Sequence, residues 1–128
     1  AVRRAKASVK IVAPKISGAT LSDGSTLPAD GQLAGTPSLV FDAVALIVDN
    51  AAAARLCRDV AARDFVTNAY AHLKAIAFTA DAKALLDTCG IRDEQIDEGV
   101  VPSDNVDAFM AAASTRQWDR EAKVHALA

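Results

Sequence analysis

The sequence predicts an α/β fold with a doubly wound parallel sheet, and three features of the chain favour this class. Short apolar runs of strand length alternate with segments whose apolar residues recur at helical spacing. The clearest run, Phe41–Asp49, is apolar over nearly its whole length, as expected when helices cover both faces of a sheet. With 128 residues, the chain is long enough for one domain with a hydrophobic core.

The first third of the chain predicts a helix end, a strand and a hairpin. Residues Ala1–Ala7 carry basic side chains, which are favoured in the last turns of a helix, so we expect a helix to end there. Val9–Pro14 is then predicted to form a short apolar strand. Asp23 and Gly24 lie between the short β-prone runs of residues 20–28, which predicts a tight hairpin. The irregular loop that follows is marked by three turn-forming residues, Gly31, Gly35 and Pro37.

Helical patterns follow the later strands. Apolar residues between Asp59 and Leu73 keep roughly helical spacing, which predicts a long helix. A buried strand, Ala75–Phe78, then leads into a helix that carries Leu85 and Leu86. We expect this helix to end near Cys89 and Gly90, because glycine is a natural helix stop.

The last part of the chain predicts one more strand, one more helix and a tail. The strand is Gly99–Val101, and Ser103 is the candidate N-cap of the helix. That helix is predicted from one apolar stripe, Val106, Phe109, Met110 and Ala113. We expect residues 1–116 to form the domain and residues 117–128 to form a tail that lies on the surface or against a neighbour, with Trp118 as its anchor.

Composition excludes several classes of partner. The hydrophobic content is 52%, with aromatic residues at only 5%, so we expect a core of small and branched aliphatic side chains. The net charge of −2 gives no electrostatic reason to expect nucleic acid or an anionic membrane. No apolar run is long enough to cross a bilayer. The two cysteines are too few for a disulfide scaffold, which favours a reducing, cytoplasmic environment.

The candidate active site is the turn between the strand Ala75–Phe78 and the next helix. In many α/β hydrolytic enzymes such a turn exposes a nucleophile beside backbone N–H donors. Here the turn contains Thr79, Ala80 and Asp81, and Ala80 has no reactive group to expose. We expect Asp81 to cap the following helix and the turn to hold no catalytic residue.

Thiols and imidazoles elsewhere in the chain have structural interpretations. A nucleophile would need a nearby histidine, and the chain has only His72, late in a helix, and His125, in the polar tail. Arg58 next to Cys57 could lower the pKa of its thiol, but Cys57 precedes the long helix and is better explained as a partly buried structural thiol. Cys89 ends a helix, away from the positive N-terminal dipole that activates thiols.

Metal and phosphate sites are not expected. The acidic run Asp93–Glu98 lacks the alternating ligands and turn glycine of a calcium loop, which favours a solvated loop. A phosphate-binding loop follows a strand and opens a helix, and Gly31 and Gly35 are not placed in this way. A mononucleotide site is therefore supported only by analogy with other folds of this class.

Several segments, in order along the chain, carry a family resemblance. They are residues 23–28 (DGSTLP), 34–39 (AGTPSL), 41–44 (FDAV), 68–77 (NAYAHLKAIA) and the pair Gln117-Trp118. The chain resembles the C-terminal domain of large-subunit heme catalases, a flavodoxin-like module related to the intracellular-protease and class I glutamine-amidotransferase-like superfamily. In catalytic members of that superfamily the elbow cysteine falls at Ala80, and a glycine pair falls at Asp49 and Asn50. Both departures imply a degenerate site in a catalytically silent member.

The resemblance implies an accessory role in assembly or stability. The parent enzyme would decompose hydrogen peroxide to water and oxygen, contain heme and form a homotetramer, with the remainder of the catalase polypeptide as this chain's partner. The chain itself is not expected to bind heme or decompose peroxide. One turn before Tyr70 stands Val66, whereas the ligating tyrosine of a catalase has an arginine there. Met110 lies in the apolar stripe of a helix and is explained by core packing, so neither residue is expected to bind heme.

An alternative is a stand-alone member of the intracellular-protease-like superfamily with thiol chemistry or chaperone-like binding. The intact mass of the native protein distinguishes the two hypotheses, because the accessory domain would belong to a much longer, heme-absorbing polypeptide.

The resemblance also predicts that the fold lacks its first strand and helix. The strand Val9–Pro14 matches the second strand of the family fold, and the first strand is central in a doubly wound sheet. A vacant central position would leave buried backbone groups unpaired, at a cost of roughly 1–3 kcal/mol each. We therefore expect residues outside this chain to supply the missing strand.

Overall fold

The computed structural model describes residues 7–127, with side chains up to residue 124. The chain divides into two compact units, Ala1–Pro37 and Ser38–Ala128. The helix end expected at Ala1–Ala7 lies outside the described residues, apart from Ala7, which is not helical.

The first unit consists of short strands. Strand β1 (Val12–Ala13) pairs in parallel with β4 (Gly31–Gln32), and β2 (Ala19–Thr20) pairs antiparallel with β3 (Thr26–Leu27). The predicted hairpin is therefore confirmed. In its turn the Ser25 N–H donates to Asp23 Oδ1 at 2.9 Å, and Gly24 has a φ of +85°, which glycine adopts without strain.

The predicted loop after the hairpin contains more regular structure than expected. Gly31 lies in β4, and a short 3₁₀ helix, η1 (Leu33–Gly35), follows it. The predicted strand at Val9–Pro14 is regular only at β1.

The second unit is built on a three-stranded parallel sheet in the order β5-β6-β7, with β5 (Ala43–Leu46), β6 (Ala75–Phe78) and β7 (Val100–Pro102). Leu46 pairs with Phe78, and Phe78 with Pro102, so the carboxyl ends of all three strands meet at one edge.

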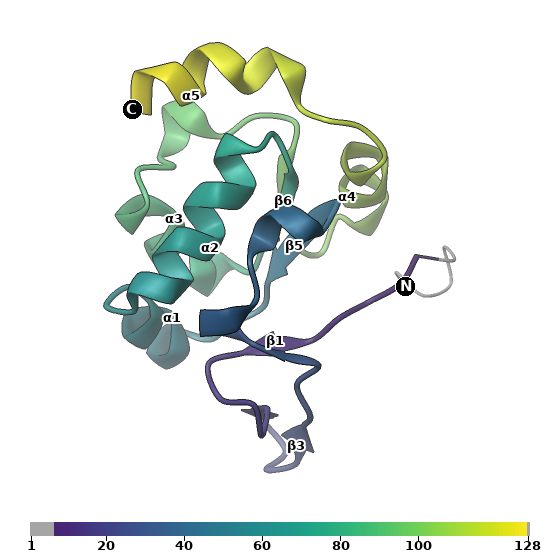
Figure 1. The fold of residues 1–128 in the computed structure, drawn as a ribbon, viewed down its shortest axis with the longest axis vertical. Coiled ribbons are helices and arrows are strands. Elements are labelled where there is room, and N and C mark those ends of the chain that lie inside the picture. The colour runs from purple at the N-terminus through teal and green to yellow at the C-terminus, as the bar shows by residue number, and fades with distance from the viewer. Residues whose placement is uncertain (1–6, 128) are drawn as a thin grey trace. The chain divides into compact units, whose positions relative to one another are not determined.

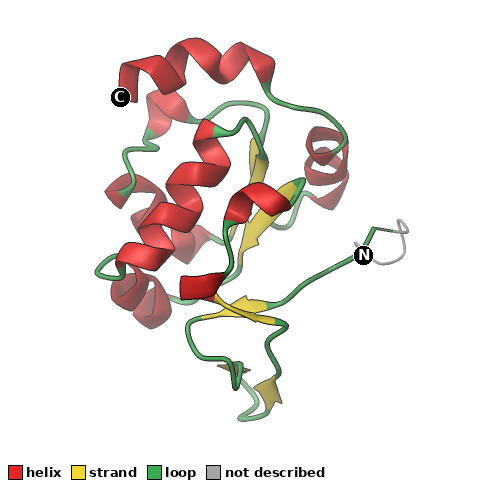
Figure 2. Cartoon of the chain, in the orientation of Figure 1, coloured by secondary structure: helices red, strands yellow, loops and turns green. Residues whose placement is uncertain are grey.

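Helices cover both faces of this sheet, which confirms the predicted α/β class with a parallel sheet. Helix α2 (Val60–Ala71) packs on one face and α4 (Val106–Ala113) on the other (Figure 1 and Figure 2). The remaining helices are α1 (Asn50–Leu56), α3 (Lys83–Thr88), α5 (Glu121–Leu127) and the 3₁₀ turns η2 (Ser38–Val40), η3 (Ala80–Ala82), η4 (Asp93–Gln95) and η5 (Trp118–Arg120).

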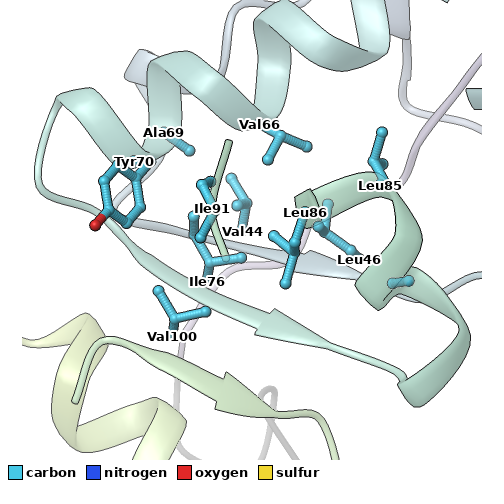
Figure 3. Packing of buried hydrophobic residues seen from close by; sticks show 11 residues of the cluster. Val44, Leu46, Val66, Ala69, Tyr70, Ile76, Leu85, Leu86, Ile91 and Val100 are labelled. Atoms are coloured by element: carbon cyan, nitrogen blue, oxygen red, sulfur yellow. The ribbon is translucent and has the colours of Figure 1, made fainter. Parts of the chain in front are cut away.

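The main core lies between α2, α3 and one face of the sheet (Figure 3). Aliphatic side chains from all three strands face the two helices, as the composition predicted. Its buried residues are Val44, Leu46, Val66, Ala69, Tyr70, Ile76, Ala82, Leu85, Leu86, Ile91 and Val100.

Two local features differ from the sequence predictions. Helix α1 was not predicted, although Asp49 caps it and four alanines, residues 51–54, favour it. The N-cap of α4 is Asn105 rather than Ser103, because two residues of turn follow β7 before the helix begins, and Asn105 Oδ1 accepts from the Ala108 N–H at 3.2 Å. Gly90 ends α3 as predicted, with a φ of +82°.

Candidate functional site

The carboxyl edge of the sheet is the candidate site, because parallel sheets place ligands and chemistry at this edge. Strand β6 ends at Phe78, and Thr79, Ala80 and Asp81 follow directly as a tight turn into η3 and α3. The predicted strand-to-helix turn is therefore present. Helix α1 lies beside it and contacts η3.

Thr79 is held by the neighbouring strand. Its N–H donates to the Leu46 carbonyl at 3.0 Å, and its hydroxyl donates to the Val48 carbonyl at 2.8 Å. These bonds extend the pairing between β5 and β6 beyond the end of the ladder. A hydroxyl used in this way is occupied as a structural donor.

Ala80 is exposed at the turn, in the outward position where an elbow enzyme carries its nucleophile. Asp81 does not cap α3, so that expectation is wrong. The chain makes the 3₁₀ turn η3 before α3, which places Asp81 inside the first turn and Ala82 at the N-cap, with no side-chain capping bond. Asp81 is left exposed near the positive end of that turn.

Asp49 and Asn50 lie at the start of α1, at the end of the neighbouring strand. Asp49 Oδ1 accepts from the Ala52 N–H at 2.7 Å and so caps the helix. An oxyanion hole needs free N–H donors that point at developing negative charge. Here a carboxylate already occupies such a donor, and its own charge would repel an oxyanion.

His72 lies far from this turn. It is the C-cap of α2, and its Nδ1 is 2.8 Å from the Asn68 carbonyl oxygen. Because β6 runs between His72 and the turn, the four residues of this strand put roughly 10 Å or more between them. His125 lies in α5, and its side chain is outside the described residues.

Both thiols are at helix C-terminal ends. Cys57 is the C-cap of α1 and Cys89 the C-cap of α3, and each is partly buried and free. Burial is the main cause that raises the pKa of the Cys89 thiol. Neither position has the helix N-terminus that produces a reactive thiolate.

The opposite, amino-terminal edge of the sheet holds a buried charged cluster that the sequence analysis missed. The Arg120 side chain is fully buried, and its Nε and Nη2 donate to the two carboxylate oxygens of Asp97 at 2.7 and 2.9 Å. Its Nη1 donates to the carbonyl oxygens of Tyr70 and Lys74 at 3.1 and 2.8 Å. The guanidinium also stacks 4.3 Å from the centre of the Tyr70 ring. We call these residues the Arg120 clamp.

The Arg120 clamp anchors the tail within the second unit. Trp118 does not enter the core, and its role as an anchor against a neighbour stays a prediction. Trp118 is 66% exposed, whereas Arg120 is 1% exposed. Bidentate pairing with Asp97, together with the bonds to the Tyr70 and Lys74 carbonyls, lets arginine be buried despite its charge. Gly99 makes room for this arrangement, because a Cβ atom there would lie 2.4 Å from Gln117 Cγ and 2.7 Å from Arg120 Nη2.

The acidic run Asp93–Glu98 predicted a solvated loop, and for Asp97 this prediction is wrong. Its side chain is 19% exposed and pairs with Arg120. Burial alone would raise the pKa of Asp97, but the bonds and charge of Arg120 outweigh burial and hold the pKa below its ordinary value of 3.8. Asp93, in the same run, is almost fully exposed and pairs with Lys83.

The surroundings of Tyr70 do not fit an axial heme ligand. Its hydroxyl donates to the Gln95 carbonyl at 2.7 Å, and the Arg120 guanidinium covers its ring. Burial, followed by the charge of Asp97, raises the pKa of the Tyr70 phenol, which opposes the phenolate that binds iron. In residues 7–124, no three histidine, cysteine or acidic side chains are grouped to hold a metal ion.

No helix in the described part of the chain is long and apolar enough to cross a membrane.

Comparison with known proteins places this chain among catalase sequences. The family described as the C-terminal domain found in long catalases matches residues 1–121. The chain is 40% identical over 130 residues to Catalase C of Rhizobium meliloti (strain 1021), a match that covers 97% of this chain and 18% of that protein. It is 33% identical over 132 residues to Catalase HPII of Pseudomonas aeruginosa, with 99% of this chain and 18% of that protein covered.

A third relative agrees with the first two. Catalase HPII of Pseudomonas putida is 31% identical over 121 residues, which covers 91% of this chain and 16% of that protein. The chain thus spans less than a fifth of the length of these relatives. The resemblance drawn from the sequence is confirmed, and the chain belongs to the family of C-terminal domains found in long catalases.

Proposed function

We propose that this chain is the catalytically silent accessory domain of a long heme catalase, with a role in assembly or stability. The parent polypeptide would decompose hydrogen peroxide to water and oxygen, with its heme held by residues outside this chain. It would act as a homotetramer in the cytoplasm, and the rest of the catalase polypeptide would be the partner of this chain.

The chemistry of the carboxyl edge of the sheet is the observation that carries this proposal. Ala80 has no nucleophile, the Thr79 hydroxyl is bonded to Val48, and Asp49 occupies a donor that an oxyanion would need. The thiol or chaperone alternative has less support, since Cys57 and Cys89 both lie at helix C-termini.

The domain boundaries and the missing strand belong to the same proposal. Residues 1–116 would form the domain, residues 117–128 its C-terminal tail, and a strand from outside this chain would extend the sheet at β5. In support, β5 is an outer strand of the three-stranded sheet, and Ile47 just beyond it is 65% exposed. An open strand edge with apolar neighbours favours pairing with another strand.

Deletion of residues 1–128 from the native-length protein tests the accessory role. We expect peroxide turnover per heme to stay within about twofold of the intact protein, because the chemistry lies elsewhere, while the midpoint of thermal inactivation falls. Loss of turnover in a deletion variant that still forms the heme-loaded tetramer would contradict the proposal.

Heme titration of the 128-residue chain tests cofactor binding separately. We expect no Soret band, because Tyr70 is hydrogen-bonded and stacked in the core. A Soret band that disappears in the Tyr70→Phe variant would contradict this expectation.

A further inference from the structure

Cys57 and Cys89 lie at one point of the second unit, where α1 and α3 contact each other and α2. Each is the C-cap of its helix, partly exposed to solvent and free. Neither residue has a part in the proposed function.

Hydrogen bonds connect the two cysteines through Thr88 and Arg63. The Thr88 hydroxyl lies 3.3 Å from Cys57 Sγ, and Thr88 is the residue before Cys89. Arg63 of α2 contacts both cysteines, since its carbonyl oxygen is 3.8 Å from Cys89 Sγ and its Nη1 donates to the Cys57 carbonyl at 3.4 Å. After burial, which is the largest cause, the charge of Cys57 also raises the pKa of the Cys89 thiol.

We propose that Cys57 and Cys89 form a dithiol that peroxides oxidise to an intrachain disulfide joining the ends of α1 and α3. The Cys57 thiolate would attack the terminal oxygen of the hydroperoxide, break the O–O bond and become a sulfenic acid, with release of water or an alcohol. The Cys89 thiolate then attacks Cys57 Sγ, forms the S–S bond and displaces the sulfenic oxygen as water. The two thiols lose two protons and two electrons, which reduce one hydroperoxide to an alcohol, or hydrogen peroxide to water, with one further water.

The surroundings assign the first step to Cys57. The Thr88 hydroxyl has one hydrogen, which it donates to the Ala84 carbonyl at 2.9 Å or turns toward a Cys57 thiolate. Cys89 places its Sγ against the Arg63 carbonyl oxygen, and burial raises the pKa of its thiol. It therefore suits the resolving role, in which it attacks a sulfur that is already oxidised.

The site is suited to slow modification rather than rapid turnover. Helix C-termini disfavour thiolates, and the last turns of α1 and α3 must shift to bring the two Sγ atoms to bonding distance. Helix ends are the parts of helices that move most readily. The disulfide would fix the C-terminal end of α1 to that of α3, and α3 would separate it along the chain from the strand-to-helix turn at Thr79.

Peptide mapping of the native-length protein tests the proposal. An organic hydroperoxide is the oxidant, because a catalase would remove hydrogen peroxide before it reached the thiols. After trypsin digestion without reduction, we expect a linked product of residues 56–58 and residues 84–92 that separates on reduction, from protein that still migrates as a single chain. Thiols that stay free, oxidise separately or link two chains would overturn the proposal.

Single variants assign the two roles. We expect Cys89→Ser to trap a sulfenic acid on Cys57 that dimedone captures, and Cys57→Ser to give no such adduct on Cys89. Thr88→Val should slow formation of the linked product by roughly fivefold, the effect of losing about one neutral hydrogen bond. An equal dimedone yield on either cysteine, or an unchanged rate in Thr88→Val, would contradict the assigned roles. The test does not depend on the proposed function, since the disulfide would form in a protein without catalase activity.

Discussion

The two edges of the three-stranded sheet use polar residues in opposite ways. At the carboxyl edge, Thr79, Ala80 and Asp81 form the turn expected of an active site, but the Thr79 hydroxyl is bonded to backbone and Ala80 is inert. At the amino-terminal edge, the Arg120 clamp buries a full positive charge and satisfies it with Asp97 and two carbonyl groups.

This difference shows where the chain depends on specific polar chemistry. Buried ion pairs do not add much net stability, but removal of one partner is costly because the other charge stays buried. An exposed turn without a reactive group can change at little cost. We therefore expect substitutions at the Arg120 clamp to have large effects on stability and substitutions at the turn to have small ones.

The largest effect is expected for Arg120→Ala. This change leaves the Asp97 carboxylate partly buried without its partner. It also removes the side-chain donor of the Lys74 carbonyl, while the Tyr70 carbonyl keeps the Leu73 N–H as a donor. We expect the free energy of unfolding to fall by about 3–5 kcal/mol, measured by urea unfolding. The control is Arg116→Ala, an exposed arginine in the same part of the chain, which should change it by less than about 0.5 kcal/mol. Equal losses in the two variants would remove the special role of Arg120.

A smaller loss is expected for Gly99→Ala. The new methyl group would clash with Gln117 and with Arg120, which cannot move away without breaking its pairing with Asp97. We expect a loss of about 1–3 kcal/mol in the free energy of unfolding. Gly35→Ala is the matched control, because no heavy atom lies within 4 Å of its Cβ position. A tolerated Gly99→Ala would mean that the tail packs less tightly than described.

The Arg120 clamp should also make stability depend on pH. Because the pKa of Asp97 is lower in the folded protein than its ordinary value of 3.8, its contribution is complete above that value and is lost as the pH falls through the folded pKa. Urea unfolding between about pH 5 and pH 2 should therefore show a smaller fall in stability for Asp97→Asn than for the unchanged protein. Parallel curves would indicate that other carboxylates account for the acid sensitivity.

The smallest effect is expected at the turn itself. Ala80→Cys restores a thiol to the elbow position, but His72 lies at the other edge and Asp49 caps the neighbouring helix. We expect no turnover of activated ester substrates above background and a stability change below about 0.5 kcal/mol. Substantial hydrolysis by this variant would show that the site is less degenerate than its residues indicate.

Regular elements and the position of the elbow could be predicted from sequence because their signals are local. Strands β5 and β6 are continuous apolar runs, and the hairpin follows from Asp23 and Gly24. Helix α1 was predictable in principle from Asp49 and the alanines after it. It was missed because alanine-rich segments have little amphipathic pattern.

The Arg120 clamp could not be predicted in the same way, because it depends on long-range contacts. Tyr70, Asp97 and Arg120 are more than twenty residues apart from one another, and no spacing rule relates them. A single arginine in a polar tail indicates a solvated residue, and Trp118 is the more obvious anchor from its size. In the fold, Arg120 instead reaches Asp97 and the carbonyl groups of Tyr70 and Lys74, and Trp118 does not enter the core.

The comparison between the two edges is tested most directly in the native-length protein. Peroxide turnover per heme and the rate of thermal inactivation can be measured together for Arg120→Ala and Ala80→Cys. We predict that Arg120→Ala inactivates faster on heating with turnover at ambient temperature unchanged, and that Ala80→Cys changes neither property. A fall in turnover for Ala80→Cys, without faster inactivation, would contradict the conclusion that the carboxyl edge is silent and the amino-terminal edge structural.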